Sequence, residues 1–263
     1  MIRSGYKVLL STRVHIVGLI ILLALLACGR NSPIDNAENW VKQAQSKWPQ
    51  ITMTNQVVFD DTTFTDFASS FLVDTGTDTL AITCKNVFAS FAAIGLFTVD
   101  FKDKLESWKM YPKNSCDDIV ELGELVNRNP SEMAALPNIA NNTDWLVFKV
   151  KSGNENIFPL KLGDGSFKAG EYLYNLGWGN EEKNGPSKLY KFKVFRMVGN
   201  QIFMQPVNFT EEPAGLSGSP IFNSKGQLVG ILSGVEDNLA RACSVYYLFD
   251  ILKKHQLYVP SAK

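Results

Sequence analysis

Histidine is nearly absent from the 263-residue sequence, which contains two histidines and four cysteines and carries no net charge. Because 26 basic residues face 26 acidic ones, the chain lacks the basic surplus that nucleic-acid binding and polybasic attachment to lipid headgroups need. No CxxC pair and no Cys/His cluster occurs, so we expect no metal site, and no motif indicates a cofactor.

Three basic residues, Arg3, Lys7 and Arg13, precede an uncharged apolar run at 16–27. This run is too short to span a bilayer and predicts the apolar core of an export signal. It ends in the letters LLAC, where a small residue is followed directly by Cys28. Removing such a signal would subtract the three basic residues and leave the remaining chain slightly acidic.

This ending resembles the lipobox of bacterial lipoproteins. The resemblance implies a signal peptide at 1–27, a lipid on Cys28 as the new N-terminus, and attachment to a membrane of the bacterial cell envelope. In some bacteria the residue in the place of Gly29 sorts lipoproteins between membranes. Because it is not aspartate here, the periplasmic side of the outer membrane is favoured. An ordinary cleavable signal and an uncleaved anchor are the alternatives.

The segment that follows divides into a tether and a helix. Residues 28–36 form a short polar tether, and apolar residues then recur at helical spacing over 37–50. This spacing predicts a short amphipathic helix. We expect it to pack on the domain; a helix that binds a partner is the alternative.

From Ile51 onward, short apolar runs rich in β-branched and aromatic residues alternate with turn residues, which predicts an all-β barrel or sandwich. A polar break at 151–156 divides these runs, so that 51–152 and 153–263 suit two small barrels. Three stretches are expected to be helical: 86–91, 116–127 and the amphipathic run that begins at Val245.

The stretch GLSGSP at 215–220 is followed by an apolar pair, a glycine-containing turn and the letters LVGIL. Gly215 can adopt a backbone conformation closed to other residues, so that its N–H and that of Ser217 can hold a developing oxyanion. The next strand runs into Ser233 and Gly234, where a backbone edge can add an extended peptide as a further strand. A plain turn entering a β-hairpin is the alternative.

This stretch resembles the nucleophile segment of trypsin-like serine proteases, and most closely that of bacterial members with the motif Gly-x-Ser-Gly-Ser-Pro. The letters TDWLVFKV, which contain Asp144, resemble the segment of the family that carries the catalytic aspartate. The letters KAGEYLYNLGWGN resemble a strand of its second barrel. The resemblance implies an all-β fold, a double β-barrel of the chymotrypsin type with a short N-terminal helix and a C-terminal helix.

Leu216 and Glu211 occupy two further positions of the family pattern. Leu216 stands where animal members have an aspartate that pairs with a freed N-terminal amine, and the absence of aspartate agrees with a lipidated N-terminus. Glu211, six residues before Ser217, corresponds to the base of the specificity pocket, where a carboxylate favours a basic side chain. A solvated Glu211-Glu212 turn is the alternative.

The histidine segment of the family is matched by the letters TCKNVF, in which Asn86 occupies the histidine position. Asparagine accepts no proton near neutral pH, so an arrangement of Asp144, Asn86 and Ser217 lacks a general base. The two histidines of the chain do not replace it, since His15 lies in the signal and His255 on the terminal helix.

Two neighbours of Asn86 bear on this missing base. Lys85 would form a dyad with the serine only if burial lowered its pKa, and we expect its side chain to point away from that of Asn86. Cys84 suits a disulfide or a buried apolar position as well as chemistry. Together with Cys116 and Cys243 it allows at most one intramolecular disulfide.

These features predict a membrane-anchored homologue of trypsin-like serine proteases that is catalytically impaired and binds an extended peptide or protein partner at the cell envelope. An active serine endopeptidase that uses Ser217 with an unconventional base is the second hypothesis. A structural envelope protein without a ligand in the cleft is the third.

Overall fold

The computed structural model describes residues 40–99, 101, 103–128, 142–179, 185–207 and 215–258. All of them belong to one compact unit, Glu38–Lys263. The predicted signal peptide at 1–27, the predicted lipid attachment at Cys28 and the tether at 28–36 lie outside the described residues. Within the described part of the chain, no helix combines the length and the apolar character needed to cross a membrane.

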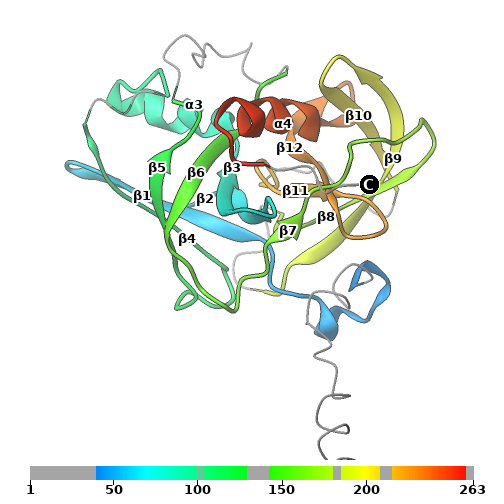
Figure 1. The fold of residues 1–263 in the computed structure, drawn as a ribbon, viewed down its shortest axis with the longest axis horizontal. Helices are drawn as coiled ribbons and strands as arrows, with labels where there is room; N and C mark the ends of the chain where they lie inside the picture. Colours follow the sequence, from blue (N-terminus) through cyan, green and yellow to red (C-terminus); the bar gives the residue numbers. More distant parts are fainter. Residues whose placement is uncertain are drawn as a thin grey trace, which may run out of the picture. The chain divides into compact units, whose positions relative to one another are not determined.

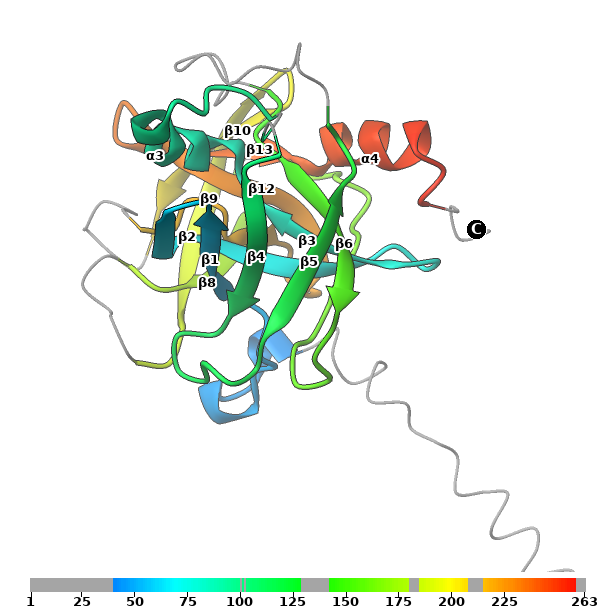
Figure 2. The same ribbon diagram turned by 90° about the vertical axis from the view of Figure 1, so that its left-hand side faces the viewer.

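Six antiparallel strands close into a first barrel (Figures 1 and 2). They are β1 (Met53–Phe59), β2 (Thr62–Asp74), β3 (Thr79–Thr83), β4 (Leu105–Tyr111), β5 (Val120–Leu125) and β6 (Leu146–Ser152). The barrel closes because β1 pairs with both β2 and β4, while the second half of β2 pairs with β3. A short strand, β7 (Leu160–Lys161), adds a parallel pairing at the end of β2.

Aromatic side chains fill the first barrel. The Phe91 ring lies 4.9 Å from Phe59 and 5.8 Å from Trp108, and the Trp108 ring lies 4.9 Å from Phe148. Edge-on and tilted contacts of this kind add about 0.5–1.5 kcal/mol per pair to the burial of the rings. Three short helices follow β3: η3 (Lys85–Val87), α3 (Phe88–Phe91) and η4 (Ala92–Ile94). They confirm the predicted helical turn, which packs on the barrel core through Phe91.

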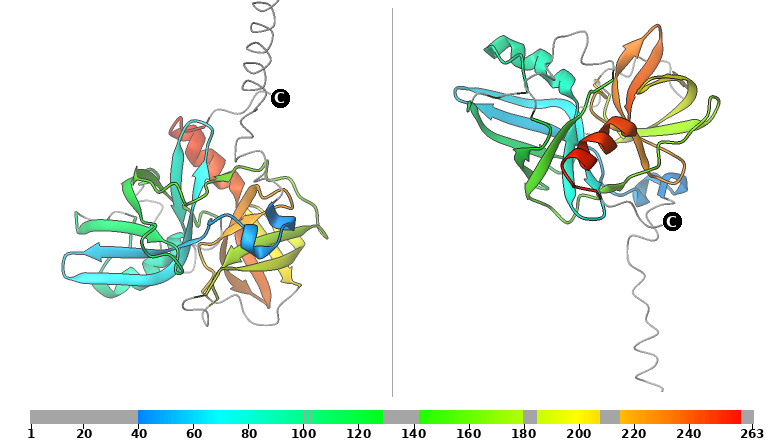
Figure 3. Two further views of the ribbon diagram at one scale, coloured as in Figure 1. Left: turned by 90° about the horizontal axis from the view of Figure 1, so that it is seen from below. Right: turned by 45° about the horizontal axis from the view of Figure 1, so that its top comes forward.

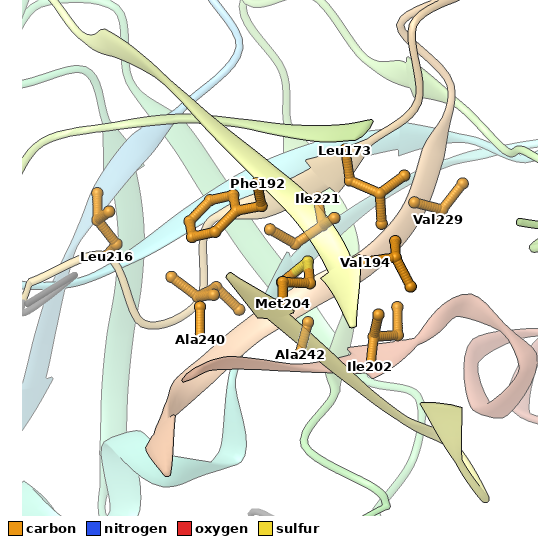
Figure 4. Packing of buried hydrophobic residues seen from close by; sticks show 11 residues of the cluster. Leu173, Phe192, Val194, Ile202, Met204, Leu216, Ile221, Val229, Ala240 and Ala242 are labelled. Atoms are coloured by element: carbon orange, nitrogen blue, oxygen red, sulfur yellow. The ribbon is translucent and has the colours of Figure 1, made fainter. Parts of the chain in front are cut away.

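A second closed barrel has the strand order β10-β13-β12-β11-β8-β9 and lies beside the first (Figure 3). Its strands are β8 (Tyr172–Gly177), β9 (Lys188–Val198), β10 (Gln201–Pro206), β11 (Pro220–Phe222), β12 (Leu228–Glu236) and β13 (Leu239–Ser244). All six strands contribute to one buried apolar cluster (Figure 4). The predicted fold class, a double β-barrel of the chymotrypsin type with short helices, is therefore confirmed.

The predicted N-terminal helix is present as two short 3-10 helices, η1 (Trp40–Lys42) and η2 (Gln45–Lys47). Trp40 is buried, and its ring centroid lies 4.8 Å from that of Phe222 in β11. Gly226 makes room for the indole, because a Cβ at this glycine would lie 2.6 Å from Trp40 Nε1. As expected, this segment packs on the domain.

The predicted helix at 116–127 is wrong, because the structure has strand β5 there. Val120, Leu122 and Leu125 are buried, and β5 pairs with β4 and with β6. Val120 and Leu122 are two residues apart and point to the same face of a strand, which is the period that a barrel wall requires. The segment therefore forms a strand that pairs with two neighbours, although its apolar residues also have helical spacing.

The predicted terminal helix is confirmed as α4 (Val245–Lys254). The hydroxyl of Ser244 accepts a hydrogen bond of 3.2 Å from the Tyr246 N–H and caps the first turn. Leu248 and Leu252 are buried, so the helix packs with one apolar face inward.

Candidate active site

Asn86 and Asp144 lie close together, beside the end of one strand of the first barrel and the start of another. Asn86 lies in η3 directly after β3, and Asp144 precedes β6, the strand that pairs with β3. The backbone N–H of Asn86 donates a hydrogen bond of 3.0 Å to Oδ1 of Asp144, whose side chain is completely buried. Pairing of β3 with β6 thus brings together two residues that lie 58 positions apart in the sequence.

The side-chain amide of Asn86 is held from both ends. Its Nδ2 donates to the carbonyl oxygen of Ser233 at 3.0 Å, and its Oδ1 accepts from the thiol of Cys84 at 2.8 Å. The amide nitrogen has no lone pair that takes a proton near neutral pH, and the amide oxygen is only a hydrogen-bond acceptor. Asn86 therefore links Cys84 to β12 but offers no general base.

One oxygen of the buried Asp144 carboxylate has no partner. Neither Asp144 Oδ2 nor Ser233 Oγ has a hydrogen-bond partner among the described residues, although both atoms are buried. Burial raises the pKa of Asp144 from 3.8 to about 7. The Ser233 hydroxyl lies near the carboxylate without a hydrogen bond of ordinary geometry, and its proximity lowers this pKa. The N–H groups of Asn86 and Lys85 and the positive charge of Lys85 lower it as well. An N–H donor facing Oδ2 would favour the ionised form further.

The loop that carries Ser217 is fixed by backbone hydrogen bonds. Gly218 N–H donates to Leu232 O at 2.8 Å, and Ser219 N–H donates to Leu216 O at 2.9 Å. Gly215 and Gly218 have φ of +87° and +85°, values that favour glycine. The predicted need for glycine at position 215 is thus met by the backbone, and Ser217 is presented on a tight turn.

This loop is bonded to the first barrel as well. Ser69 N–H donates to Ser217 O at 2.6 Å, while Ser69 O accepts from Thr83 Oγ1 at 2.8 Å. A Cβ at Gly218 would overlap Ser69 O and would lie 3.0 Å from Cys84 Sγ, the same thiol that contacts Asn86. The structure therefore places the Ser217 segment, the Cys84 thiol and Asn86 in one contiguous group between the barrels.

The Ser217 side chain is half-buried, and within the described part of the chain its hydroxyl has no hydrogen-bond partner. A serine hydroxyl is a weak nucleophile unless a base lies within hydrogen-bond reach. The arrangement supplies backbone N–H groups at Ser217 and Gly215, but no described side chain takes the hydroxyl proton.

Leu216 is part of the core of the second barrel (Figure 4). Its side chain is fully buried in the apolar cluster, and a Cβ at Gly177 would lie 2.8 Å from its Cδ2. An aspartate at this position would place a carboxylate among apolar side chains. The leucine instead holds the Ser217 loop by packing.

Beyond Leu232, one edge of strand β12 is open with respect to the described strands. Gly234, Val235 and Glu236 pair with β13 on one side, and no described strand pairs with them on the other. The register shifts between Leu232 and Gly234, so that Ser233 lies at a bulge, with its carbonyl toward Asn86. The edge begins at the candidate site, at Ser233 and Gly234. Glu211, the predicted pocket residue, lies outside the described residues.

Lys85 is a residue whose position sequence reasoning missed. Its side chain is only 1% exposed, and its Nζ lies 5.1 Å from the ring centroid of Tyr247 in α4. The Asn86 amide, in contrast, contacts Ser233 and Cys84. A lysine at a strand end gives no sequence signal for burial, because the helix that covers it lies 160 residues away. His255, also considered from the sequence, is exposed just after α4.

The three cysteines that follow Cys28 are free thiols. Cys84 and Cys243 are buried, and Cys116 is exposed. Burial, followed by the charge of Asp144, raises the pKa of the Cys84 thiol well above its ordinary value, so this thiol is a hydrogen-bond donor rather than a thiolate. No disulfide constrains the site.

The family model for the trypsin-like peptidase domain matches residues 68–231 of the chain. A search of curated proteins found no match. The matched range runs from β2 to β12 and includes Asn86, Asp144 and Ser217, the residues that the two barrels bring together. Because this range covers more than half of the sequence, the chain belongs to the trypsin-like peptidase domain family.

Proposed function

We propose that this trypsin-like protease homologue is catalytically impaired and acts by binding an extended peptide or protein partner while anchored to a membrane of the bacterial cell envelope. The observation that carries the proposal is the amide of Asn86. The sequence resemblance assigns Asn86 to the histidine position, and its Nδ2 and Oδ1 bond to Ser233 and Cys84. Acyl transfer needs a group that takes the serine proton and returns it to the leaving amine.

The size of the expected impairment follows from the serine-protease template. Loss of one triad member leaves about 10³–10⁴-fold acceleration over water, which comes from the oxyanion site and from binding. The positive φ of Gly215, next to the Ser217 loop, supports an oxyanion site, and the edge of β12 supports binding. Retained binding without proton transfer is the behaviour expected of a peptide-binding module.

The open edge suits an extended peptide. Backbone groups of Gly234 and Val235 face no described strand on one side, so a peptide can add there as a further strand. The nearest atom to a Cβ at Gly234 would be Arg241 Nη2 at 3.8 Å, so the glycine leaves the approach open. Anchoring is proposed through a lipid on Cys28.

A direct test compares covalent labelling with peptide binding. A fluorophosphonate probe requires an activated serine hydroxyl, so we expect no labelling of Ser217 in the exported chain. On an array of unfolded peptides, Ser217→Ala should bind as the parent chain does, whereas Gly234→Leu should lose binding. Gly76→Leu is the matched control, because Gly76 has φ of +83° and a Cβ there would meet nothing within 4 Å.

Each alternative has its own outcome. Labelling of Ser217 in the parent chain would replace the proposal with an active endopeptidase that uses an unconventional base. Peptide binding that Gly234→Leu leaves intact would place the partner away from the cleft, and absence of binding would favour a purely structural envelope protein.

A further inference from the structure

The positive charge of the second barrel is concentrated on one strand. Strands β8, β9 and β10 contain four basic residues and no acidic one, and all four lie in β9: Lys188, Lys191, Lys193 and Arg196. Elsewhere in this barrel's strands, Arg241 and Glu236 form an ion pair at 2.8 Å. The three strands therefore carry a local excess of basic residues, although the composition of the whole chain is balanced.

Strand register directs these side chains outward. Phe192 and Val194 are buried in the barrel core, so the alternating Lys191 and Lys193 point to the outer face. Lys191 Nζ lies 3.9 Å from the ring centroid of Tyr172, which is exposed on β8.

A register shift in the β9–β10 pairing places Arg196 on the same outer face as Lys191 and Lys193. Beyond it, Arg196 pairs with Phe203 and lies over its ring at 4.6 Å. Phe203 itself is buried beneath Arg196. We call the outer surface formed by Tyr172, Lys191, Lys193 and Arg196 the basic face.

Exposed apolar side chains adjoin the basic face. Phe195, Met197 and Val198, at the end of β9, are 49%, 37% and 55% exposed, and we call them the apolar tip. Basic side chains beside exposed apolar ones match a lipid surface, where headgroups carry charge and the acyl boundary accepts apolar groups.

The N-terminal segment joins the domain beside the same strand. Gln45 Nε2 donates a hydrogen bond of 3.0 Å to the carbonyl of Ser187, the residue directly before β9. Trp40, where the described chain begins, packs on Phe222 of the same barrel. A chain tethered through the residues before Trp40 is therefore held at the barrel that carries the basic face, beside the start of β9, whereas the apolar tip lies at the other end of this strand.

We propose that the basic face and the apolar tip bind the surface of a bilayer that contains anionic phospholipid. This contact goes beyond peptide binding in the cleft and shares with the proposed function only the presence of a membrane. Attraction of basic side chains to an anionic surface falls off within the screening length, about 10 Å at 0.1 M salt. The contact should accordingly weaken with salt and require anionic lipid.

The experiment replaces Val198 in the full chain with photoreactive p-benzoylphenylalanine and measures lipid adducts by mass spectrometry on vesicles. Vesicles of phosphatidylcholine alone are compared with vesicles that also contain phosphatidylglycerol. Phe97, which is 57% exposed on the segment that follows η4, is replaced in the same way as the control position. We expect adducts at position 198 to increase several-fold with phosphatidylglycerol, and adducts at position 97 to stay low.

Charge reversal supplies the second arm. Lys193→Glu with Arg196→Glu should abolish the gain from phosphatidylglycerol at position 198, and high salt should do the same. Both side chains lie outside the barrel core, so an unchanged thermal melting curve checks that the fold is intact.

Three outcomes would overturn the proposal. Equal adduct yields at positions 198 and 97, or yields at 198 that charge reversal leaves unchanged, would show that this face does not contact lipid. If the chain still floats with phosphatidylcholine vesicles in that case, the proposed anchoring survives and only the basic face fails. If polyglutamate reduced the lipid adducts at position 198 and became cross-linked there itself, the basic face would bind an acidic polymer instead of lipid.

Discussion

The backbone N–H of Asn86 donates a 3.0 Å hydrogen bond to Oδ1 of Asp144, while Oδ2 of the same buried carboxylate has no partner among the described residues. The amide of Asn86 turns to the Ser233 carbonyl instead. The backbone N–H of Asn86 thus contacts Asp144, but the side chain of Asn86 does not make the hydrogen bond to Asp144 that a proton relay needs. Stability and chemistry at this site should therefore respond differently to mutation.

Asp144 should make the protein less stable as the pH rises. Its pKa is about 7 in the folded state, above the ordinary value of 3.8, so the folded state holds a proton that the unfolded state releases. Stability is therefore full below about pH 4 and declines until about pH 7. Asp144→Asn removes this decline, so its stability relative to the parent chain should grow by roughly 2–3 kcal/mol between pH 5 and pH 8.

Urea denaturation at the two pH values measures this difference. Asp118→Asn is the control, because hydrogen bonds from Asn156 and Ser115 lower the pKa of the half-buried Asp118. Asp118 is ionised in both states over this range, so its variant should show no change between the two pH values. If the stability of Asp144→Asn relative to the parent chain were also the same at both pH values, this result would contradict the raised pKa.

Gly218→Ala should cost more stability than Gly76→Ala. The two glycines have φ of +85° and +83°, so both variants share the backbone cost of about 1–2 kcal/mol. Only at Gly218 would the new Cβ overlap backbone, namely Ser69 O, and we expect a further loss of about 1–3 kcal/mol. Urea midpoints measure both, and equal losses would mean that the contact between the barrels is not rigid.

Alkylation should distinguish the cysteines. In the native protein Cys116 is exposed, whereas Cys84 and Cys243 are buried with raised pKa values, about 12 for Cys243. Iodoacetamide followed by peptide mapping should modify Cys116 first, and the other two only in denaturant. Rapid native modification of Cys84 would contradict the described position of its thiol against Asn86.

Leu216→Asp should destabilise the second barrel by at least about 3 kcal/mol, because it buries a carboxylate in an apolar cluster and removes packing. Leu216→Met conserves volume and should cost less than about 1.5 kcal/mol. Thermal unfolding of both variants provides the measurement. A well-tolerated aspartate would indicate a cation near position 216 that the described residues do not supply.

Much of the architecture is predictable from local sequence. Short apolar runs with turn residues between them predict the strands, and the segments around Asp144 and Ser217 predict where the site forms. The strand β5 was missed because its buried Val120 and Leu122 are recognisable only once β4 and β6 lie on either side.

Long-range packing sets the remaining features. Lys85 is buried because α4 covers it, and the Cys84 thiol lies against Gly218 of the Ser217 loop, 134 positions away in the sequence. Neither depends on the residues next to them in the sequence. The Asn86 hydrogen bond to Ser233 likewise spans 147 positions and follows only from the meeting of the barrels.

The most direct test of the central claim introduces the missing base. Asn86→His places an imidazole where Oδ2 of Asp144 is free to accept its N–H and where the Ser217 loop lies in the same group of contacts. The parent chain, Asn86→His and Asn86→His with Ser217→Ala are compared for fluorophosphonate labelling and peptide hydrolysis. We predict that only Asn86→His labels Ser217, with a gain of about 10²–10⁴-fold from general-base catalysis. Labelling of the parent chain at a similar rate would contradict the account.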